Sequence, residues 1–393
     1  MSAFAAVMTG PGSGAIATIG LLGASAEAAL REVFRGKGDK PFELTTGRIL
    51  LGDIVEDGET VDEVTIGCEG PHTFAIHCHG NPLIVERILK LLQRRGVQPV
   101  PADQLLLRML TAEEPHDAIS VEARLALTTV KTVEGAALVT HQMKAGLARK
   151  ARQWRDSLPS RSLQQIAAEA TQILQDSEPA RLIISGCTIA LVGPPNTGKS
   201  TLLNTLAGRE KAIVTDVPGT TRDWVSAEIH IPPLAATIID TAGLDPTLPA
   251  TAGTIDQAAQ RKSTEILERA DLVLLVLDRS RPAGHIDPNL VSKLSVERTI
   301  VVLNKADLPP QLDTALLPQQ LGRRVPISAR LGTGIENLIQ AIHQTHGLTD
   351  LSPGSAAAFT NRQRFLLEQL AVVDSPDRAA ALVAELLFGR VER

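Results

Sequence analysis

One short segment constrains this chain more than any other: Gly193–Ser200, which reads G-P-P-N-T-G-K-S. It matches the pattern G-x-x-x-x-G-K-[ST] and lies between an apolar run, Thr188–Val192, and an amphipathic stretch, Thr201–Ala207. A strand, a glycine-rich turn and a helix in this order form a phosphate-binding loop, in which backbone N–H groups and the helix N-terminus face the phosphates. The segment therefore predicts a nucleotide-binding α/β domain with a mostly parallel, Rossmann-like sheet.

The regularity of the following sequence supports this fold class. Further continuous apolar runs occur at Ala235–Ile239, Leu272–Leu277, Thr299–Leu303 and Val325–Ile327. Such runs are typical of parallel strands covered by helices on both faces. Residues from about 115 to 183 instead predict two or three helices, the clearest over Ser162–Gln175, and Asn361–Val391 is helical again. We therefore expect an α/β domain inserted into a helical domain.

The N-terminal part predicts an α+β domain. Short apolar runs separated by Gly and Asp-Gly turns lie at Ala15–Ile19, Arg48–Ile54, Val61–Gly67 and Thr73–His77. An amphipathic helix follows over Pro82–Arg95. A chain of 393 residues exceeds the size of a single core. We expect an α+β domain at 1–112, a helical domain at 113–185 plus 348–393, and the nucleotide-binding domain at 186–347.

Composition excludes several classes of protein. The net charge of −5 gives no overall attraction to nucleic acid. Three scattered cysteines indicate a reducing compartment, and neither a signal peptide nor a transmembrane run is recognisable, so we expect a cytoplasmic protein without a membrane span.

Two further groups of residues are interpreted as structural. For His77, Cys78 and His79, packing within a strand is favoured over a metal site, because the sequence has no second pair of ligands at the spacing of a zinc site. The basic stretch Lys144–Arg155 is interpreted as a solvated helix face rather than an RNA-binding one.

The phosphate side of the predicted site is completed by a second motif. Lys199 is expected to reach the β- and γ-phosphates, and the Ser200 hydroxyl to bind Mg²⁺. Asp240-Thr241-Ala242-Gly243 ends an apolar run, which places a carboxylate near Mg²⁺ and the Gly243 N–H near the γ-phosphate. The remaining predicted contacts from the first loop are Asn196, Thr197, Gly198 and Thr201.

The base is predicted to be guanine. Asn304-Lys305-Ala306-Asp307 follows another apolar run and matches N-K-x-D. The Asp307 carboxylate can accept hydrogen bonds from guanine N1–H and N2–H₂, a donor pair that adenine lacks. Ser328-Ala329 follows a further run and is expected to support the base. Four motifs in this order, each at the end of a strand, predict a GTP-binding and GTP-hydrolysing enzyme.

The sequence predicts that water is not activated as it is in Ras-like proteins. The segment Thr215–Asp223, T-D-V-P-G-T-T-R-D, is interpreted as a loop that closes a threonine on Mg²⁺ and the γ-phosphate, the alternative being an ordinary Pro-Gly turn. Leu244 stands where Ras-like proteins have a water-orienting glutamine. Because leucine cannot orient water, another polar group must do so.

Motifs outside this domain extend the pattern. They are Met8–Ala17, Thr46–Leu50, Val61–Val64, Ile76–Gly80 and Thr360–Gln363. Together with the nucleotide motifs, they resemble the tRNA-modification GTPase family called MnmE or TrmE. The resemblance implies homodimers formed by an N-terminal domain similar to tetrahydrofolate-binding folds, GTP-dependent pairing of the GTPase domains, and modification of the tRNA wobble uridine with a partner flavoprotein.

The resemblance also implies a site chemistry. It implies K⁺ in place of an arginine finger, with ligands Asn196, Thr215, Val217 and Thr220. It implies Mg²⁺ ligands Ser200 and Thr221, with Lys199 and Thr221 taking part in catalysis. Alignment puts Asp256 at the position of the family's catalytic glutamate. A solvated residue at a helix start is an equally open reading of Asp256, whose side chain is one methylene shorter.

The chain departs from the family in the motifs that the resemblance links to tetrahydrofolate and its one-carbon chemistry. Gly20 replaces an arginine, Ala75 replaces a glutamate, and the terminal C-I-G-K is replaced by Phe388–Arg393. These differences put tetrahydrofolate binding in doubt. Two hypotheses therefore remain: a K⁺- and Mg²⁺-dependent GTPase that modifies tRNA, or a divergent GTP switch that kept the dimer scaffold, lost the folate chemistry and regulates another partner.

Overall fold

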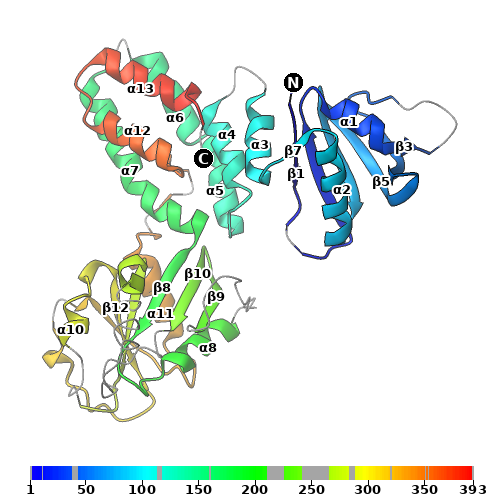
Figure 1. Ribbon diagram of the computed structural model, residues 1–393. Coiled ribbons are helices and arrows are strands. Elements are labelled where there is room, and N and C mark those ends of the chain that lie inside the picture. Colours follow the sequence, from blue (N-terminus) through cyan, green and yellow to red (C-terminus); the bar gives the residue numbers. More distant parts are fainter. Residues whose placement is uncertain are drawn as a thin grey trace. The chain divides into compact units, whose positions relative to one another are not determined.

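The computed structural model describes residues 2–10, 12–37, 43–112, 117–158, 161–209, 225–240, 265–282, 288–318, 321–349, 351–352 and 354–391. The chain divides into two compact units, Met1–Asp117 and Ala118–Arg393 (Figure 1). The first unit is coloured blue to cyan in the figure, and the second continues from cyan to red.

The first unit contains a seven-stranded sheet in the order β3-β4-β5-β6-β2-β1-β7. Its strands are β1 (Ala3–Val7), β2 (Ile16–Leu22), β3 (Phe34–Gly36), β4 (Ile49–Glu56), β5 (Glu59–Gly70), β6 (Thr73–His79) and β7 (Val97–Pro99). Its helices are α1 (Ala26–Val33), α2 (Pro82–Arg94) and α3 (Ala102–Thr111). The four predicted strands and the predicted helix are present. The strands β1, β3 and β7 were missed because they are only three to five residues long, and the amphipathic helices α1 and α3 were missed as well.

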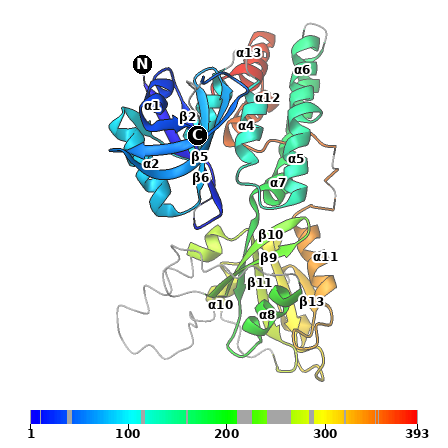
Figure 2. The same cartoon turned by 90° about the vertical axis from the view of Figure 1, so that its right-hand side faces the viewer.

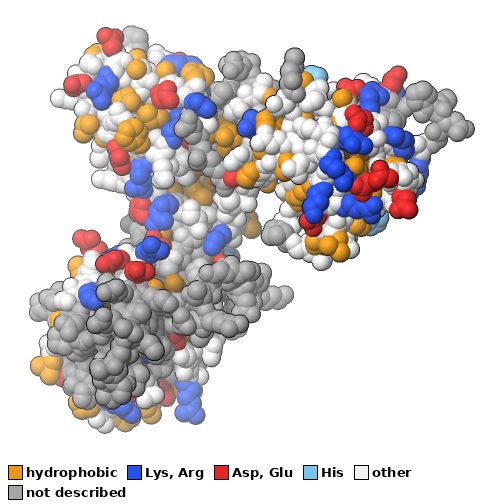
Figure 3. Space-filling view, viewed as in Figure 1, with side chains coloured by type: hydrophobic (Ala, Val, Ile, Leu, Met, Phe, Trp, Pro, Cys, Tyr) orange, Lys and Arg blue, Asp and Glu red, His pale blue; other side chains and the backbone are white. Residues whose placement is uncertain are grey.

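One face of this sheet packs on α1 and α2. Ile19, Ile66 and Ile76 of the sheet share a core with Leu30 and Ile88 of the helices, and all five are fully buried. Each such side chain contributes about 1.5–3 kcal/mol when removed from water. On the surface of this unit, at the right of Figure 3, Lys and Arg side chains alternate with Asp and Glu.

The second unit contains a six-stranded sheet in the order β13-β12-β11-β8-β10-β9. Its strands are β8 (Cys187–Val192), β9 (Val225–Ile231), β10 (Leu234–Asp240), β11 (Leu272–Asp278), β12 (Thr299–Asn304) and β13 (Arg323–Pro326). All are parallel except β9, which pairs with β10 in the antiparallel sense. The continuous apolar runs are therefore confirmed as parallel strands, and every residue of β11 and β12 is buried.

Separate apolar cores cover the two faces of this sheet. One contains residues of α8 (Lys199–Arg209) and α11 (Ile335–Thr345), among them Leu202 and Leu338. The other contains Leu267, Leu317 and Leu321, from segments between the strands. The short helix α10 (Pro288–Val291) also lies in this part of the chain. Burial on both faces explains why these strands carry no alternating polar residues.

Helices precede and follow the sheet. They are α4 (Ala118–Ala126), α5 (Val133–Lys144), α6 (Leu147–Ser157), α7 (Leu163–Ser185), α12 (Asn361–Ala371) and α13 (Pro376–Phe388). The prediction of two or three helices before the sheet was wrong, since the described residues form four. The boundary between α5 and α6 is a single short turn at Ala145 and Gly146, which leaves the helical spacing almost uninterrupted. Helix α7 begins after the capping residue Ser162, as predicted, but continues to Ser185.

The helices on both sides of the sheet share one core. Trp154 of α6, Ile173 of α7, Leu367 of α12 and Leu386 of α13 belong to the same buried cluster. The sheet is therefore inserted into a helical bundle, as the composition of the flanking segments predicted. Figure 2 shows α7 leading directly toward the sheet, where Gly186 alone separates it from β8.

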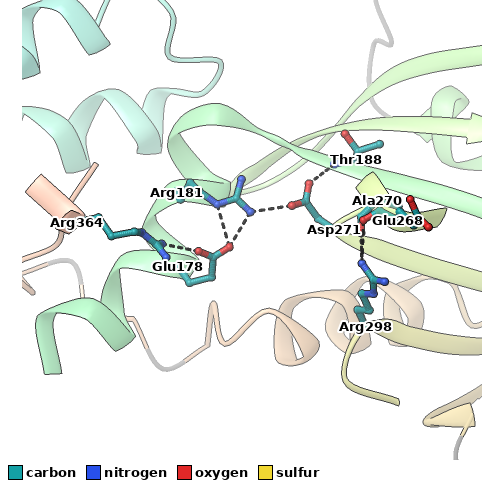
Figure 4. A network of polar contacts seen from close by, with 8 residues as sticks. All are labelled: Glu178, Arg181, Thr188, Glu268, Ala270, Asp271, Arg298 and Arg364. Atoms are coloured by element: carbon teal, nitrogen blue, oxygen red, sulfur yellow. Dashed lines mark hydrogen bonds and ion pairs between the residues drawn. The ribbon is translucent and has the colours of Figure 1, made fainter. Parts of the chain in front are cut away.

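A polar network joins the helices to the sheet (Figure 4). Arg181 of α7 contacts Glu178 and Asp271, each at 2.7 Å. Asp271, directly before β11, also accepts a hydrogen bond from the backbone N–H of Thr188 at 2.8 Å. Glu178 in turn contacts Arg364 of α12 at 2.7 Å. The network thus connects both helical segments to the starts of two central strands.

The helices in the described part of the chain are too short or too polar to span a membrane.

Candidate nucleotide-binding site

The predicted site residues lie at the carboxyl ends of the central strands. The first loop follows β8, Asp240 ends β10, Asn304 ends β12, and Ser328 comes shortly after β13. Because parallel strands direct their carboxyl ends to the same edge, motifs that are far apart in the sequence meet there. The predicted residues outside the described part of the chain are Thr215, Val217, Thr220, Thr221, Thr241, Ala242, Gly243, Leu244 and Asp256.

Two glycines allow the first loop to turn tightly. Gly193 has a φ of +136°, and a Cβ there would lie 2.2 Å from the carbonyl oxygen of Val276. Gly198 has a φ of +94°, and its Cβ would lie 2.3 Å from Nδ2 of Asn304. A side chain at either position would collide with a neighbouring strand end. The glycines of the motif are therefore required by close packing as well as by backbone conformation.

The loop curls around the ammonium group of Lys199. Its Nζ donates hydrogen bonds to the carbonyl oxygens of Gly193 at 2.8 Å and Pro194 at 2.9 Å. The hydroxyl of Thr197 donates to the same Pro194 carbonyl at 2.9 Å. The side chain of Lys199 is buried and lies in the first turn of α8, whose N-terminus carries positive potential. This concentration of positive charge suits a polyphosphate.

Ser200 and Asp240 form the part of the site that suits Mg²⁺. The Ser200 hydroxyl donates to Oδ2 of Asp240 at 2.8 Å, and Asp240 is almost completely buried. Hydroxyl and carboxylate oxygens are hard ligands of the kind Mg²⁺ prefers beside phosphates. The donor set present in the described residues therefore fits a magnesium ion.

The side chain of Asn304 forms hydrogen bonds with two different loops of the site. Its Nδ2 donates to the carbonyl oxygen of Thr197 at 2.8 Å, and its Oδ1 accepts from the N–H of Ala329 at 2.9 Å. The side chain is 3% exposed. It thus connects the phosphate loop with the loop after β13, and both polar ends of the amide are satisfied.

Asp307 lies exposed at the edge of the site. A hydrogen bond from the hydroxyl of Ser328 is the main cause that lowers the pKa of Asp307 below its usual value. Ser328 itself is buried, and its Oγ accepts from the N–H of Leu331 at 3.2 Å. An ionised, pre-oriented carboxylate is the group required to accept two hydrogen bonds from a guanine ring.

Two further residues belong to the site, and the motif analysis missed both. Asp278 ends β11, and its Oδ2 lies 2.6 Å from Nζ of Lys305. Thr205 of α8 donates to the carbonyl oxygen of Ala329 at 2.7 Å. Asp278 follows an apolar run in the same way as Asp240 and Asn304, which is a signal that was available in the sequence. No comparable signal marks Thr205.

Two of the positions at which the chain departs from its resemblance, Gly20 and Ala75, lie in the first unit. Gly20 of β2 and Ala75 of β6 are directly paired across adjacent strands. A Cβ at Gly20 would meet Leu105 of α3 at 3.0 Å and Met8 at 3.1 Å. The space above Gly20 is thus filled by apolar side chains. These residues do not fit a charged cofactor such as tetrahydrofolate, which requires polar partners.

The histidines of β6 have partners within the sheet. His77 Nδ1 lies 3.0 Å from the hydroxyl of Thr18, and His79 Nδ1 lies 2.7 Å from Oδ1 of the buried Asp62. Cys78 points into the core. Among the described residues, no group of three His, Cys, Asp or Glu side chains is arranged to hold a metal ion.

Two protein families match parts of the chain. Residues 188–305 match the family described as 50S ribosome-binding GTPase, and residues 3–103 match the family described as GTP-binding protein TrmE N-terminus. The two matched regions contain, respectively, the nucleotide loops up to Lys305 and most of the first unit.

Curated relatives match almost the whole chain. The tRNA modification GTPase MnmE of Thermotoga petrophila is 31% identical, over 94% of this chain and 88% of the relative. Those of Synechococcus sp. and Clostridioides difficile are 32% and 28% identical, over 93% and 99% of this chain and 86% and 91% of the relatives. The similarity therefore extends over both units.

Proposed function

The chain belongs to the MnmE family of tRNA modification GTPases, and on that premise we propose that it couples hydrolysis of GTP to modification of the wobble uridine of tRNA. The observation that carries the proposal is the convergence of the phosphate loop, the Ser200–Asp240 pair and the Asp307 carboxylate at one sheet edge. Phosphate binding, a magnesium ligand set and a guanine acceptor are the parts that binding and hydrolysis of GTP need, and the tRNA part of the proposal rests on the family.

Guanine selectivity is assigned to Asp307. The carboxylate accepts hydrogen bonds from N1–H and from the 2-amino group of guanine, whereas xanthine has a carbonyl at C2 and therefore needs a donor there. Asp307→Asn supplies that donor. We expect the variant to lose affinity for GTP and to gain affinity for XTP, measured by competition with a fluorescent nucleotide. If the variant keeps the wild-type preference for GTP, the base-recognition role of Asp307 is wrong.

Hydrolysis is assigned to two cations and a carboxylate. Ser200 and Thr221 would hold Mg²⁺, which neutralises charge on the phosphates when bound. Asn196, Thr215, Val217 and Thr220 would hold K⁺ at the position of an arginine finger. Asp256 is the proposed carboxylate that orients water. Lys199 and Thr221 would contact the transferred phosphate.

Two measurements test this assignment. Hydrolysis should be faster in K⁺ than in Na⁺ at equal ionic strength, and equal rates would remove the K⁺ role. Asp256→Ala should lower kcat while leaving GTP binding unchanged. An unchanged kcat would show that another group orients the water.

A second candidate function is supported by the paired positions Gly20 and Ala75. The absence of polar groups there, with Leu105 and Met8 above Gly20, favours a divergent GTP switch that no longer uses tetrahydrofolate and regulates another partner. Titration with 5-formyltetrahydrofolate, followed by calorimetry, separates the two functions. Binding at micromolar ligand would contradict the switch hypothesis. No binding at millimolar ligand, measured at two temperatures, would exclude folate-dependent modification by this chain.

The proposed assembly is a homodimer formed through the N-terminal domain, with GTP-dependent pairing of the GTPase domains, in the cytoplasm. Domain bounds of 1–112, 113–185 plus 348–393, and 186–347 remain part of this proposal. A flavoprotein partner and tRNA are expected to bind the dimer. Light scattering with and without GTP and aluminium fluoride measures the pairing, and pull-down with flavin fluorescence detects the partner. A monomer under both conditions would overturn the assembly.

A further inference from the structure

Asp278 is surrounded by hydrogen-bond donors at the edge of the nucleotide site. Its Oδ1 accepts from the N–H of Ser280 at 2.9 Å and from the Ser280 hydroxyl at 2.6 Å. Its Oδ2 accepts from Nζ of Lys305 at 2.6 Å, and Nε of Arg281 lies 3.6 Å away. The side chain of Asp278 is only 6% exposed. Such an arrangement holds a carboxylate in one orientation.

Lys305 extends this arrangement to the phosphate loop. The same Nζ donates to the main-chain carbonyl oxygen of Asn196 at 3.0 Å. Asn196 has a φ of +60° and Lys305 a φ of +63°, so both are in the left-handed region although neither is glycine. That conformation costs about 1–2 kcal/mol for most residues and less for Asn, and it persists where surrounding contacts hold it. The ammonium group of Lys305 is such a contact for Asn196.

The charge of Asp278 is needed for this geometry. Burial, the largest single effect on its pKa, raises it, but the hydrogen bonds from Lys305 and Ser280 outweigh burial and the pKa is lowered. The carboxylate is thus ionised near neutral pH. An amide in its place would turn an N–H₂ group toward either Lys305 or Ser280, so one donor would face another donor.

We propose that Asp278 is a positioning residue, which fixes the ammonium group of Lys305 and thereby the main chain of Asn196, so that it sets both nucleotide affinity and activation by K⁺. The cation part rests on the proposed function, because it uses Asn196 as a K⁺ ligand. Asp278 touches neither nucleotide nor cation in this scheme, and acts only through Lys305.

The first experiment uses the full-length protein with Asp278→Asn. We expect the K⁺ concentration for half-maximal GTP hydrolysis to rise about tenfold, with a smaller change in kcat at saturating K⁺. Asp271→Asn is the matched control, since Asp271 lies at the opposite end of the same strand and pairs with Arg181; its half-activating K⁺ should equal that of wild type. An unchanged K⁺ dependence in Asp278→Asn would overturn the cation part.

A second experiment is independent of K⁺. GDP affinity is measured in Na⁺ for Asp278→Asn, Lys305→Met and the double variant. If Asp278 acts through Lys305, the double variant binds GDP as Lys305→Met does. Additive losses would overturn the link. If circular dichroism shows that Asp278→Asn does not fold, Asp278→Glu is used in both experiments. The glutamate retains the negative charge but moves the carboxylate away from its position in Asp278.

The outcomes also separate this inference from the proposed function. If wild type shows no activation by K⁺, the K⁺ assignment and the cation part fail together. The comparison of GDP affinities among the single and double variants then still decides whether Asp278 positions Lys305. If wild type is activated by K⁺ but Asp278→Asn keeps the same half-activating concentration, the proposed function stands and this inference fails.

Discussion

Asn304 and Thr197 are joined by a hydrogen bond of 2.8 Å that connects the base side of the nucleotide site to its phosphate loop. The donor is Nδ2 of the buried amide, and the acceptor is the main-chain carbonyl oxygen of Thr197. The Oδ1 atom of the same amide accepts a hydrogen bond from the N–H of Ala329. A single side chain therefore sets the relative position of two loops that are far apart in the sequence.

Asn304→Asp tests this bridge. The substitution keeps the acceptor for Ala329 but places a carboxylate oxygen against the carbonyl of Thr197. We expect a loss of about 1–3 kcal/mol in the free energy of unfolding and a weaker affinity for GTP. Urea titration and nucleotide fluorescence measure the two effects. Asn337→Asp, on the exposed surface of α11, is the control and should change neither.

Gly193→Ala is expected to abolish tight nucleotide binding. The new Cβ would lie 2.2 Å from the carbonyl oxygen of Val276, so the phosphate loop must shift. Gly208→Ala in α8 is the matched control, because nothing lies within 4 Å of its Cβ. The control should raise the free energy of unfolding by about 0.5–1 kcal/mol. Equal GTP affinities for the two variants would contradict the packing argument for Gly193.

Glu122→Ala tests the core shared by the helices before and after the sheet. The Glu122 carboxylate is buried and accepts hydrogen bonds from Thr360, Arg362 and Gln363 at 2.7–2.8 Å. Its removal leaves the Arg362 guanidinium without that partner, which costs about 3–5 kcal/mol for a buried pair. Glu368→Ala, on the exposed face of α12, should cost less than about 0.5 kcal/mol. Similar losses for both variants would argue against a single helical core.

Burial should make the three cysteines unreactive at pH 8. Loss of water around each thiol raises the pKa of Cys68, that of Cys78 to about 11 and that of Cys187 to about 12. Below its pKa a thiol is protonated, and only the thiolate reacts quickly. Iodoacetamide at pH 8 should therefore label the folded protein slowly and all three sites in urea. Rapid labelling of the folded chain would contradict this environment.

Arg181→Ala tests the junction between helix α7 and the sheet. Both partners of Arg181 are partly exposed, so each pair contributes about 0.2–1 kcal/mol, and we expect a total loss of about 1 kcal/mol. Arg155→Ala, whose pair with Asp156 is exposed on both sides, should change the free energy of unfolding by less than about 0.5 kcal/mol. The difference should shrink in 1 M salt, since salt screens ion pairs. A difference unaffected by salt would indicate that packing, rather than charge, holds the junction.

Local patterns in the sequence determined much of this protein. The phosphate-binding loop could be recognised because its glycines, Lys199 and Ser200 occupy consecutive positions between a strand and a helix. The parallel strands could be recognised because burial on both faces requires continuous apolar runs. Asp307 could be proposed as the guanine acceptor from its motif alone. In each case the physical requirement acts on residues that are close together along the chain.

Tertiary structure decided what depends on contacts between distant residues. The contact of Asp278 with Lys305, and of Lys305 with Asn196, exists because β11, β12 and the loop after β8 end at the same sheet edge. The pairing of Gly20 with Ala75 depends on the register between β2 and β6, two strands that are far apart along the chain. The sequence alone could propose most of the groups expected to carry the chemistry. Only packing and register determined which of them touch.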